Sequence, residues 1–521
     1  MSTTPLESFI GYKAETGMQC GNYTIDIPKP GPGEQYRFHF DATKCVGCRC
    51  CEVACNEQNN NPSEVKWRRV GEMEGGSFPE TLTLFNSMSC NHCIDPACLI
   101  GCPTESYIKF DNGIVFHDDP SCIGCQYCTW NCPYGVPTYH SERHIVTKCH
   151  MCHERLAADQ TPACVQACPS GAIEIEVVNV EAWKEGTIDD QGNMPHLADA
   201  RLTHSTTRFT LPDTLPEAMI KADEHHLKPA HPEFPLVFMT VLTQMSLGAF
   251  GALFIGDLLA LFGFFQPGWI LAALVVLPAA IGLPLSALHL GRPLGALRAM
   301  KNLRTSWLSR EAAALGAFTG LMSVNVLLYF LDVAAPLRIA FEALTLAAGV
   351  YGIHAQAMIY RIPARPSWDR ESTNRKFFTT AYGGMYLVAL GLLVTGHDSS
   401  AVPLLSIATV TAVVHAFFTH AAYDELKYST QPQLAKTYRL YTERFARTQK
   451  IRTATFATGA VALPIAAIFF ASSGLGIAAS VAMGIGFVLL CISEFTDRFL
   501  FYTTVVPLQM AGGFFVGTQR N

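Results

Sequence analysis

The cysteines in the first third of this 521-residue chain have the spacing of iron–sulfur ligands. Gaps of two residues let a tight loop point three thiolates at one 4Fe–4S cube, while a fourth cysteine starts a short helix and points towards a partner cube. Two groups have the spacing C-x2-C-x2-C-x3-C, and two are variants with a middle gap of four or eleven residues. Together they predict four 4Fe–4S clusters in two crossed pairs. The four groups are Cys45, Cys48, Cys51 and Cys55; Cys90, Cys93, Cys98 and Cys102; Cys122, Cys125, Cys128 and Cys132; and Cys149, Cys152, Cys164 and Cys168.

Zinc is the alternative occupant of paired C-x2-C sequences. Zinc knuckles rarely use C-x2-C-x2-C-x3-C, and a proline follows the last cysteine of three groups, as in ferredoxins. The first eighteen residues lack a basic region and an apolar core, so we expect no secretory signal and no disulfide scaffold. Cys20, Cys50 and Cys491 break the spacing and are interpreted as bystanders.

The apolar C-terminal half carries a second set of candidate residues. A quinone that exchanges electrons and protons needs an apolar slot, a hydrogen-bond donor and a proton path. His289 and Glu311, at the edge of two predicted membrane helices, would supply the donor and the path. The alternative is that both residues face headgroup water.

Three further histidines raise a rival hypothesis, a b-type haem held between facing helices. They are His354, His415 and His420. Buried polar residues bonded between helices are the simpler interpretation, because no pair at matched depth is evident. We also expect Asp257 to be interfacial and Glu494 to pair with Arg498, four residues on.

Eight apolar spans of bilayer length predict an all-α eight-helix transmembrane bundle. Basic residues gather in the loops after the second, fourth and sixth spans, whereas the opposite loops hold only Arg338. The positive-inside rule places the rich loops, and with them the N-terminal domain, on the cytoplasmic side of a prokaryotic inner membrane. The predicted spans are 236–263, 269–290, 311–331, 337–360, 378–396, 401–421, 454–473 and 475–493.

The cysteine-rich part has short β-prone stretches between its groups, which is typical of a ferredoxin-like α+β domain. We therefore predict three regions: a multi-cluster domain over 1–176, a polar linker over 177–233, and a membrane anchor over 234–521. A net charge of −6, without a basic stripe, excludes a nucleic-acid partner.

Both halves resemble known proteins. Residues 37–178, with KCVGCRCCEVACNEQNNNP, CNHCIDPACLIGCP and CIGCQYCTWNCPYGVP, resemble the four-cluster subunit of dimethyl sulfoxide reductase and sulfite-oxidising molybdopterin complexes. Residues 235–515, with LHLGRPLGALRAM and SEFTDRFLFY, resemble the eight-helix anchor of dimethyl sulfoxide reductase. These are usually separate subunits, and here they look fused.

The resemblance implies which groups share clusters, the first with the fourth and the second with the third. It also implies menaquinone or ubiquinone exchange at His289 and Glu311, an anchor without haem, and a molybdopterin catalytic subunit on a separate chain. The implied ligand sets are Cys45, Cys48, Cys51 and Cys168; Cys149, Cys152, Cys164 and Cys55; Cys90, Cys93, Cys98 and Cys132; and Cys122, Cys125, Cys128 and Cys102.

The expected function is an electron relay between that catalytic subunit and the quinone pool, in which this chain is the redox subunit of an oxidoreductase. Sulfite, another sulfur compound or dimethyl sulfoxide would be the terminal substrate. A proton-pumping quinone module, which needs ionisable residues across the bilayer, and a membrane-tethered redox sensor are the alternatives.

Overall fold

The computed structural model describes residues 18–20, 23–25, 29–216, 218–260 and 268–509. The chain divides into two compact units. The first comprises residues 1–226 with 507–521 and has mixed α and β structure, and the second comprises residues 227–506 and is helical. The expected fold class, an α+β domain followed by an all-α membrane bundle, is confirmed.

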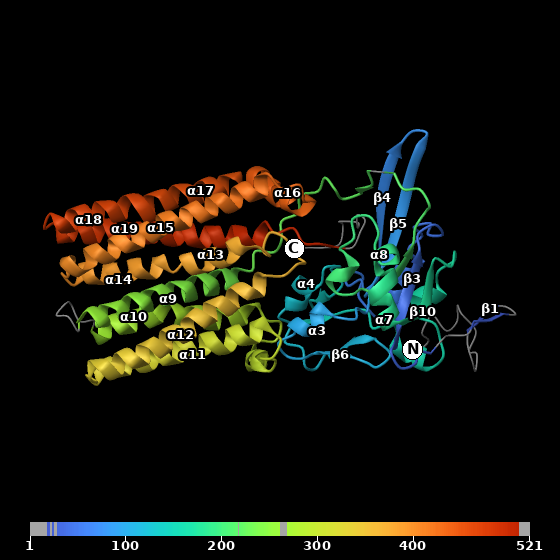
Figure 1. Ribbon diagram of the computed structural model, residues 1–521, viewed down its shortest axis with the longest axis horizontal. Helices are drawn as coiled ribbons and strands as arrows, with labels where there is room; N and C mark the ends of the chain where they lie inside the picture. Colours follow the sequence, from blue (N-terminus) through green and yellow to red (C-terminus); the bar gives the residue numbers. More distant parts are fainter. Residues whose placement is uncertain (1–17, 21–22, 26–28, 217, 261–267, 510–521) are drawn as a thin grey trace. The chain divides into compact units, whose positions relative to one another are not determined.

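The first unit is organised around small sheets that hold cysteine-bearing turns between them. In one three-stranded sheet β3 (Glu34–Asp41) lies between β10 (Ile173–Asn179), antiparallel, and β11 (Arg208–Thr210), parallel. A long hairpin of β4 (Arg69–Ser77) and β5 (Glu80–Met88) extends from this unit (Figure 1). The remaining pairs are β1 (Met18–Cys20) with β2 (Tyr23–Ile25), β6 (Tyr107–Lys109) with β7 (Val115–His117), and β8 (Thr138–His140) with β9 (Ile145–Thr147).

Five short helices follow or contain cysteines of the four groups. Each has four to nine residues, and α3 and α4 end at a cysteine that is followed by a proline, which cannot continue a helix. They are α2 (Cys50–Gln58), α3 (Ala97–Gly101), α4 (Tyr127–Asn131), α5 (His153–Ala157) and α6 (Ala163–Gln166).

The predicted linker over 177–233 is not a separate segment. Its residues up to 226 fold with the first unit, where β11 joins β3 and β12 (Ile220–Lys221) extends the hairpin at β4. Trp183 is buried there and donates from Nε1 to the carbonyl of Ser205 at 2.8 Å. Composition alone misled the prediction, because a polar segment with few apolar anchors can still pair its backbone with existing strands. The other elements are α7 (Val180–Ala182), η1 (Trp183–Thr187), α8 (Ile188–Gln191) and η2 (Ala200–Leu202).

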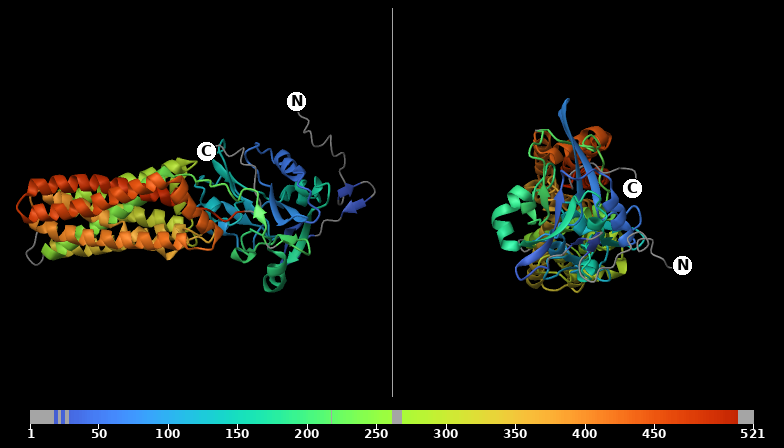
Figure 2. Two further views of the ribbon diagram at one scale, coloured as in Figure 1. Left: turned by 90° about the horizontal axis from the view of Figure 1, so that it is seen from above. Right: turned by 90° about the vertical axis from the view of Figure 1, so that its right-hand side faces the viewer.

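The second unit has eight helical spans that are long and apolar enough to cross a membrane, among its described residues. They run alongside one another in a bundle (Figure 2). Three spans are composite, since α10 and η3 (Ala287–His289) form the second, α13 and α14 form the fifth, and α17, η6 and α18 form the seventh. The elements are α9 (Phe234–Ala260), α10 (Trp269–Ser286), α11 (Trp307–Phe330), α12 (Ala335–Tyr360), α13 (Glu371–Thr379), α14 (Tyr382–Val394), α15 (Asp398–Lys427), α17 (Ala446–Phe456), η6 (Ala457–Ala462), α18 (Leu463–Ser472) and α19 (Gly476–Thr503).

Small residues let α9 and α14 approach closely. A Cβ on Gly248 would stand 1.7 Å from the carbonyl oxygen of Ala381, and one on Gly384 would stand 1.8 Å from that of Met245. Such contacts are the usual way in which membrane helices gain packing energy without a hydrophobic driving force.

The connections that carry the basic residues contain short helices of their own. These are η3 (Ala287–His289) and η4 (Pro293–Met300) after α10, and α16 (Pro432–Arg439) and η5 (Leu440–Arg444) after α15. They leave from the same end of the bundle as the start of α9 and the end of α19, where the Ala230 amide donates to the Thr503 carbonyl at 2.9 Å.

Candidate functional sites

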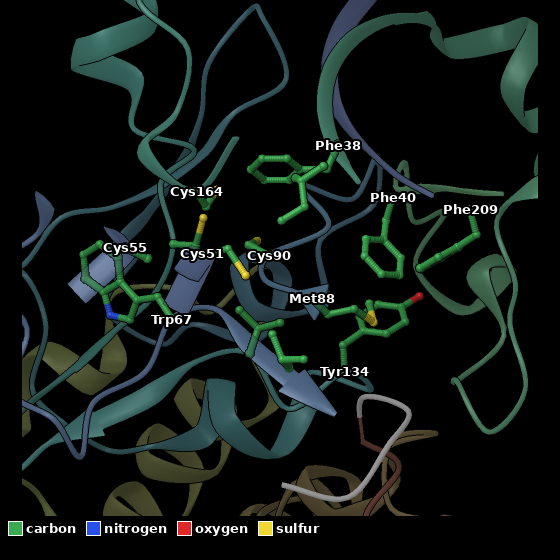
Figure 3. Close-up of a cluster of buried hydrophobic side chains, with 14 of the residues drawn as sticks. Phe38, Phe40, Cys51, Cys55, Trp67, Met88, Cys90, Tyr134, Cys164 and Phe209 are labelled. Carbon is green, nitrogen blue, oxygen red and sulfur yellow. The ribbon is translucent and has the colours of Figure 1, made fainter. Parts of the chain in front are cut away.

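A cavity in the first unit is lined by four cysteines from two different groups. Cys149, Cys152 and Cys164 of the fourth group meet Cys55 of the first. All four side chains are buried, and Phe38 and Trp67 also line the cavity. Figure 3 shows Cys55 and Cys164 with these two aromatic rings. The structure thus brings together the set that the crossed arrangement predicts.

A second cavity repeats this arrangement with the other two groups. Cys90, Cys93 and Cys98 of the second group line it together with Cys132 of the third. Thr203 donates from Oγ1 to Sγ of Cys93 at 3.1 Å. The segment after the last cysteine therefore helps to order the ligands, which sequence reasoning did not anticipate.

The remaining first-group cysteines lie within electrostatic reach of one another. Burial raises the pKa of the Cys45 thiol, and negative charge on Cys51, Cys168 and Cys48 raises it further. Cys48 is exposed at the surface of the unit. Cys168 of the fourth group therefore lies near enough to the first-group cysteines for its charge to act on Cys45.

The fourth set shows the same crossing. Burial raises the pKa of Cys125 to about 12, and the charges of Cys102 and Cys122 add to the effect. Burial likewise raises the pKa of Cys128, and the charges of Cys125, Cys102 and Cys122 raise it further. Three cysteines of the third group are thus joined by the last cysteine of the second.

One backbone conformation recurs in the four cysteine turns. The residue before the second cysteine of each group has a left-handed φ, and these residues are Gly47 (67°), His92 (42°), Gly124 (68°) and Met151 (58°). A residue with this φ bends the chain, so that the first and second cysteines of the group can direct their thiols to the same side of the turn. At Gly47 only glycine fits, because a Cβ would stand 2.6 Å from the ring of Phe85.

The four sets fit iron–sulfur clusters. Backbone amides donate to sulfur at 3.2–3.4 Å in several turns, for example from Ala172 to Cys168 and from Gly124 to Cys122. Thiolates are the form that binds iron. Burial raises the pKa of most of these thiols, including Cys51 to about 11, so they are neutral thiols unless a bound metal stabilises the thiolate.

The two residues expected at the quinone site, His289 and Glu311, lie in η3 and α11 of the second unit. His289 ends η3, and its Nδ1 bonds the carbonyl of Ser286. Glu311 is buried, and it lies a full turn inside α11 rather than at its start, because the helix already begins at Trp307. Among the described residues, no hydrogen bond or ion pair joins His289 to Glu311.

A buried polar chain leads from Glu311 across the bundle. Its carboxylate interacts with the amide of Gln356 in α12. Gln244 of α9 donates to Oε1 of Gln356 at 2.7 Å, and Arg498 of α19 donates to Oε1 of Gln244 at 2.8 Å. All four side chains are at least 94% buried. Sequence reasoning missed the two glutamines, which are uncharged and lie singly among apolar residues.

The expected pair of Glu494 with Arg498 is wrong. Glu494 accepts from the hydroxyls of Tyr382 at 2.6 Å and Thr380 at 3.3 Å, whereas Arg498 turns to Gln244. Residues four apart on a helix share a face, but they need not pair when better partners lie on neighbouring helices.

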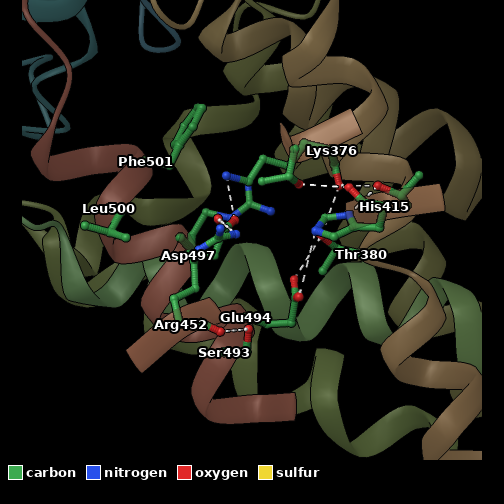
Figure 4. A network of polar contacts seen from close by, with 12 residues as sticks. Lys376, Thr380, His415, Arg452, Ser493, Glu494, Asp497, Leu500 and Phe501 are labelled. Carbon is green, nitrogen blue, oxygen red and sulfur yellow. Dashed lines mark hydrogen bonds and ion pairs between the residues drawn. The ribbon is translucent and has the colours of Figure 1, made fainter. Parts of the chain in front are cut away.

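A buried network surrounds Glu494 (Figure 4). Asp497 accepts ion pairs from Lys376 at 2.5 Å and Arg452 at 3.2 Å. His415 lies with Nε2 3.9 Å from the Glu494 carboxylate. Of the other histidines considered for haem, His354 packs its ring against Trp307, and His420 is largely exposed. The structure does not bring these three histidines together.

Asp257 and Arg338 are also not where the sequence suggested. Asp257 lies near the end of α9 and is fully buried against other helices, and Arg338 lies in the first turns of α12 rather than in a loop. Glu342, one turn on from Arg338, accepts from the hydroxyl of Tyr329 at 2.8 Å. The residues escaped prediction because each is isolated in sequence, and only helix packing assembles them.

Buried cysteine sets on an α+β scaffold, followed by eight membrane-spanning helices, define a multi-pass membrane protein with an iron–sulfur domain. Residues 81–178 match the family model of the 4Fe–4S dicluster domain, and residues 227–504 match that of the DMSO reductase anchor subunit, DmsC. The second match covers more than half of the chain. The protein therefore belongs to the DMSO reductase anchor family, with an iron–sulfur electron-transfer subunit fused in front of the anchor.

Curated relatives match the iron–sulfur part. A probable anaerobic dimethyl sulfoxide reductase chain of Escherichia coli is 38% identical over 169 residues, which are 31% of this chain and 82% of the relative. One chain of the anaerobic dimethyl sulfoxide reductase of Haemophilus influenzae is 39% identical over 30% of this chain and 80% of its own length. One subunit of the sulfite dehydrogenase of Allochromatium vinosum is 37% identical over 26% of this chain and 67% of its own length.

Proposed function

We propose that this chain relays electrons between a separate catalytic subunit and the membrane quinone pool through four 4Fe–4S clusters. The observation that carries the proposal is that each described cysteine set takes three ligands from one group and one from another. Clusters that share ligand-bearing turns lie close to one another, which is what electron transfer along a chain of centres requires.

The clusters would be held by the four crossed sets described above. A bound cluster accepts or donates one electron, and the protein's part is to place the thiolates, shield the cubes from water and set their potentials. The same sixteen cysteines would be the iron ligands. Cys50 stays outside these sets, since Cys51 provides the two-residue gap.

The quinone would exchange its protons near Glu311 and His289. Glu311 is a buried carboxyl that opens onto the two glutamines, and His289 lies in the polar connection after α10. An ionisable residue inside a membrane bundle is a functional candidate by default. The Glu311 carboxylate is therefore assigned the proton exchange, and His289 the hydrogen bond to a quinone carbonyl.

The catalytic partner would be a molybdopterin subunit that acts on dimethyl sulfoxide, sulfite or another sulfur compound. The names of the relatives support this assignment, because they are chains of dimethyl sulfoxide reductases and of a sulfite dehydrogenase. The basic connections of the bundle support a cytoplasmic position for the end from which α9 starts, in the inner membrane of a prokaryote.

Glu311→Gln tests the quinone step in the assembled complex. The variant keeps the size and the hydrogen-bonding capacity of the side chain and removes the exchangeable proton. We expect at least a hundredfold loss of quinone-coupled turnover, in line with the usual contribution of a general acid or base, with dye-coupled activity retained. Gln433→Glu in α16 is the charge-change control. Unchanged quinone turnover in Glu311→Gln would refute the role.

Movement of protons across the membrane is a second candidate function. Asp257, Glu342 and Arg338 are buried at the end of the bundle away from the basic connections. Ionisable groups therefore lie near both ends of the bundle, as proton movement across the membrane requires. Proton uptake and release by vesicles containing the complex would decide. Protons moved beyond the two that a quinone exchanges per two electrons would favour the pump.

A further inference from the structure

Arg68 is a fully buried cation at the start of the β4–β5 hairpin. It is 2% exposed. Its Nη1 donates to the carbonyl and hydroxyl oxygens of Ser87 at 3.0 and 3.2 Å, and its Nη2 donates to Oγ of Ser89 at 2.9 Å. The guanidinium carbon lies 4.7 Å from the centre of the Phe38 ring. These three hydrogen bonds end on neutral oxygens, and one aromatic face lies beside the guanidinium.

In the part of the chain that the structure describes, no carboxylate compensates this charge. Among the described residues, no Asp or Glu oxygen lies within ion-pair distance of Arg68, and its buried Nε–H has no hydrogen-bond partner. An uncompensated charge is costly inside a protein, and a buried donor without a partner adds to the cost. Something else must therefore supply negative charge and an acceptor at this place.

Two cysteine sets surround the guanidinium. Arg68 lines the cavity of Cys55, Cys149, Cys152 and Cys164. On its other side the hydroxyl of Ser87, to which it donates, lies 3.2 Å from Sγ of Cys51, a member of the set with Cys45, Cys48 and Cys168. The sulfur ligands of both sets are thus the negative groups nearest to the cation.

A purely structural role explains less of this arrangement. Arg68 does join the two strands of the hairpin, since Ser87 and Ser89 lie at the end of β5. Uncharged side chains make such bonds at a lower desolvation cost, however. The missing carboxylate, the free Nε–H and the place in the cavity wall remain unexplained by packing.

We propose that Arg68 is the shared counter-cation of the two clusters bound by the first and fourth cysteine groups, and that its charge raises the reduction potentials of both. The inference deepens the proposed relay and rests on it. Reduction adds one negative charge to a cluster, and a fixed positive charge in a low-dielectric interior favours that step. Clusters of the second and third groups, whose cavity does not include Arg68, lack this effect.

Redox titration of the whole chain, followed by electron paramagnetic resonance, tests the proposal. Arg68→Gln and Arg68→Met remove the charge, and Arg68→Lys keeps it. Arg201→Gln is the control, because Arg201 is half exposed and paired with Asp189 on the surface. In both neutral variants we expect two of the four clusters to become at least tenfold harder to reduce, which is 59 mV for a one-electron couple.

The reduction potentials of the other two clusters should not change in the neutral variants, and all four should be unchanged in Arg201→Gln. In Arg68→Lys the potentials should shift less than in the neutral variants. If the neutral variants lose two clusters while Arg68→Lys retains them, the requirement for charge is supported as well. Four unchanged potentials in a neutral variant, or equal loss of clusters in all three variants, would overturn the proposal. Iron analysis of the unaltered chain tests the relay separately, since a shortage of iron there would refute four clusters without reference to Arg68.

Discussion

Arg338 donates from Nε to Oδ2 of Asp257 at 2.6 Å, and both side chains are buried between α9 and α12. The ion pair joins α12 to α9, and its two residues are 81 positions apart in the sequence. Because neither group reaches water, each depends on the other for its charge to be tolerated.

Removal of one partner should therefore destabilise the bundle strongly. We expect Arg338→Met to lower the free energy of unfolding by about 3–5 kcal/mol, because it leaves the Asp257 carboxylate buried and unpaired. Thermal unfolding of the detergent-solubilised protein measures the effect. The double variant with Asp257→Asn should recover much of the loss.

The exposed pair of Arg439 with Glu443 is the control for that experiment. Loss of Arg439 should change the stability by less than about 1 kcal/mol, since water screens both charges. Equal effects of Arg338→Met and Arg439→Met would contradict the account of the buried pair.

The crossed ligation predicts which cluster suffers when one cysteine is lost. Cys132 belongs to the third group, but it lines the cavity of the second. Cys132→Ser should therefore change the cluster of Cys90, Cys93 and Cys98, with loss of that cluster or a three-iron signal in its place. Electron paramagnetic resonance of the oxidised protein detects a three-iron cluster.

Cys50→Ser is the matched control, because Cys50 is exposed and lies outside the four sets. It should leave all four cluster signals unaltered. A loss of signal in Cys50→Ser equal to that in Cys132→Ser would mean that the sets are assigned wrongly.

Glu176 should contribute to stability in a pH-dependent way. Burial alone would raise the pKa of this carboxyl, but hydrogen bonds from Arg208 and the charges of Arg37 and Arg208 outweigh burial and lower the pKa. A carboxyl with a lowered pKa stabilises the fold fully above its ordinary value near 4.5, and the contribution disappears as the pH falls through the lowered value.

Glu176→Gln should accordingly cost about 2 kcal/mol at neutral pH and progressively less in acid. Chemical unfolding at a series of pH values checks this, with exposed Glu185→Gln as the control. A difference between Glu176→Gln and the unaltered protein that does not shrink below about pH 4 would argue against the pKa shift.

Patterns that depend on local spacing could be predicted from the sequence. The four cysteine groups and the eight apolar spans are such patterns, because a cluster turn and a membrane helix are each specified by a short stretch of chain. The structure contains both the cysteine turns and the eight spans. The left-handed φ of Gly47 and Gly124 shows why a glycine stands before the second cysteine in two of the turns.

Features that depend on packing could not be predicted in the same way. The burial of Asp257 with Arg338, the two glutamines that connect Glu311 to Arg498, and the pairing of β11 with β3 arise only after distant segments meet. A single polar residue in an apolar span gives the same sequence pattern whether its side chain faces lipid headgroups or a partner on the next helix. The polar composition of residues 177–226 likewise concealed their backbone pairing with strands.

Iron analysis of the anaerobically purified chain, combined with spin quantification after full reduction, tests the central claim most directly. Four cubes held by the crossed cysteine sets predict about sixteen iron atoms per polypeptide and four reducible centres. Iron near eight atoms per polypeptide, or zinc in place of iron, would contradict the account.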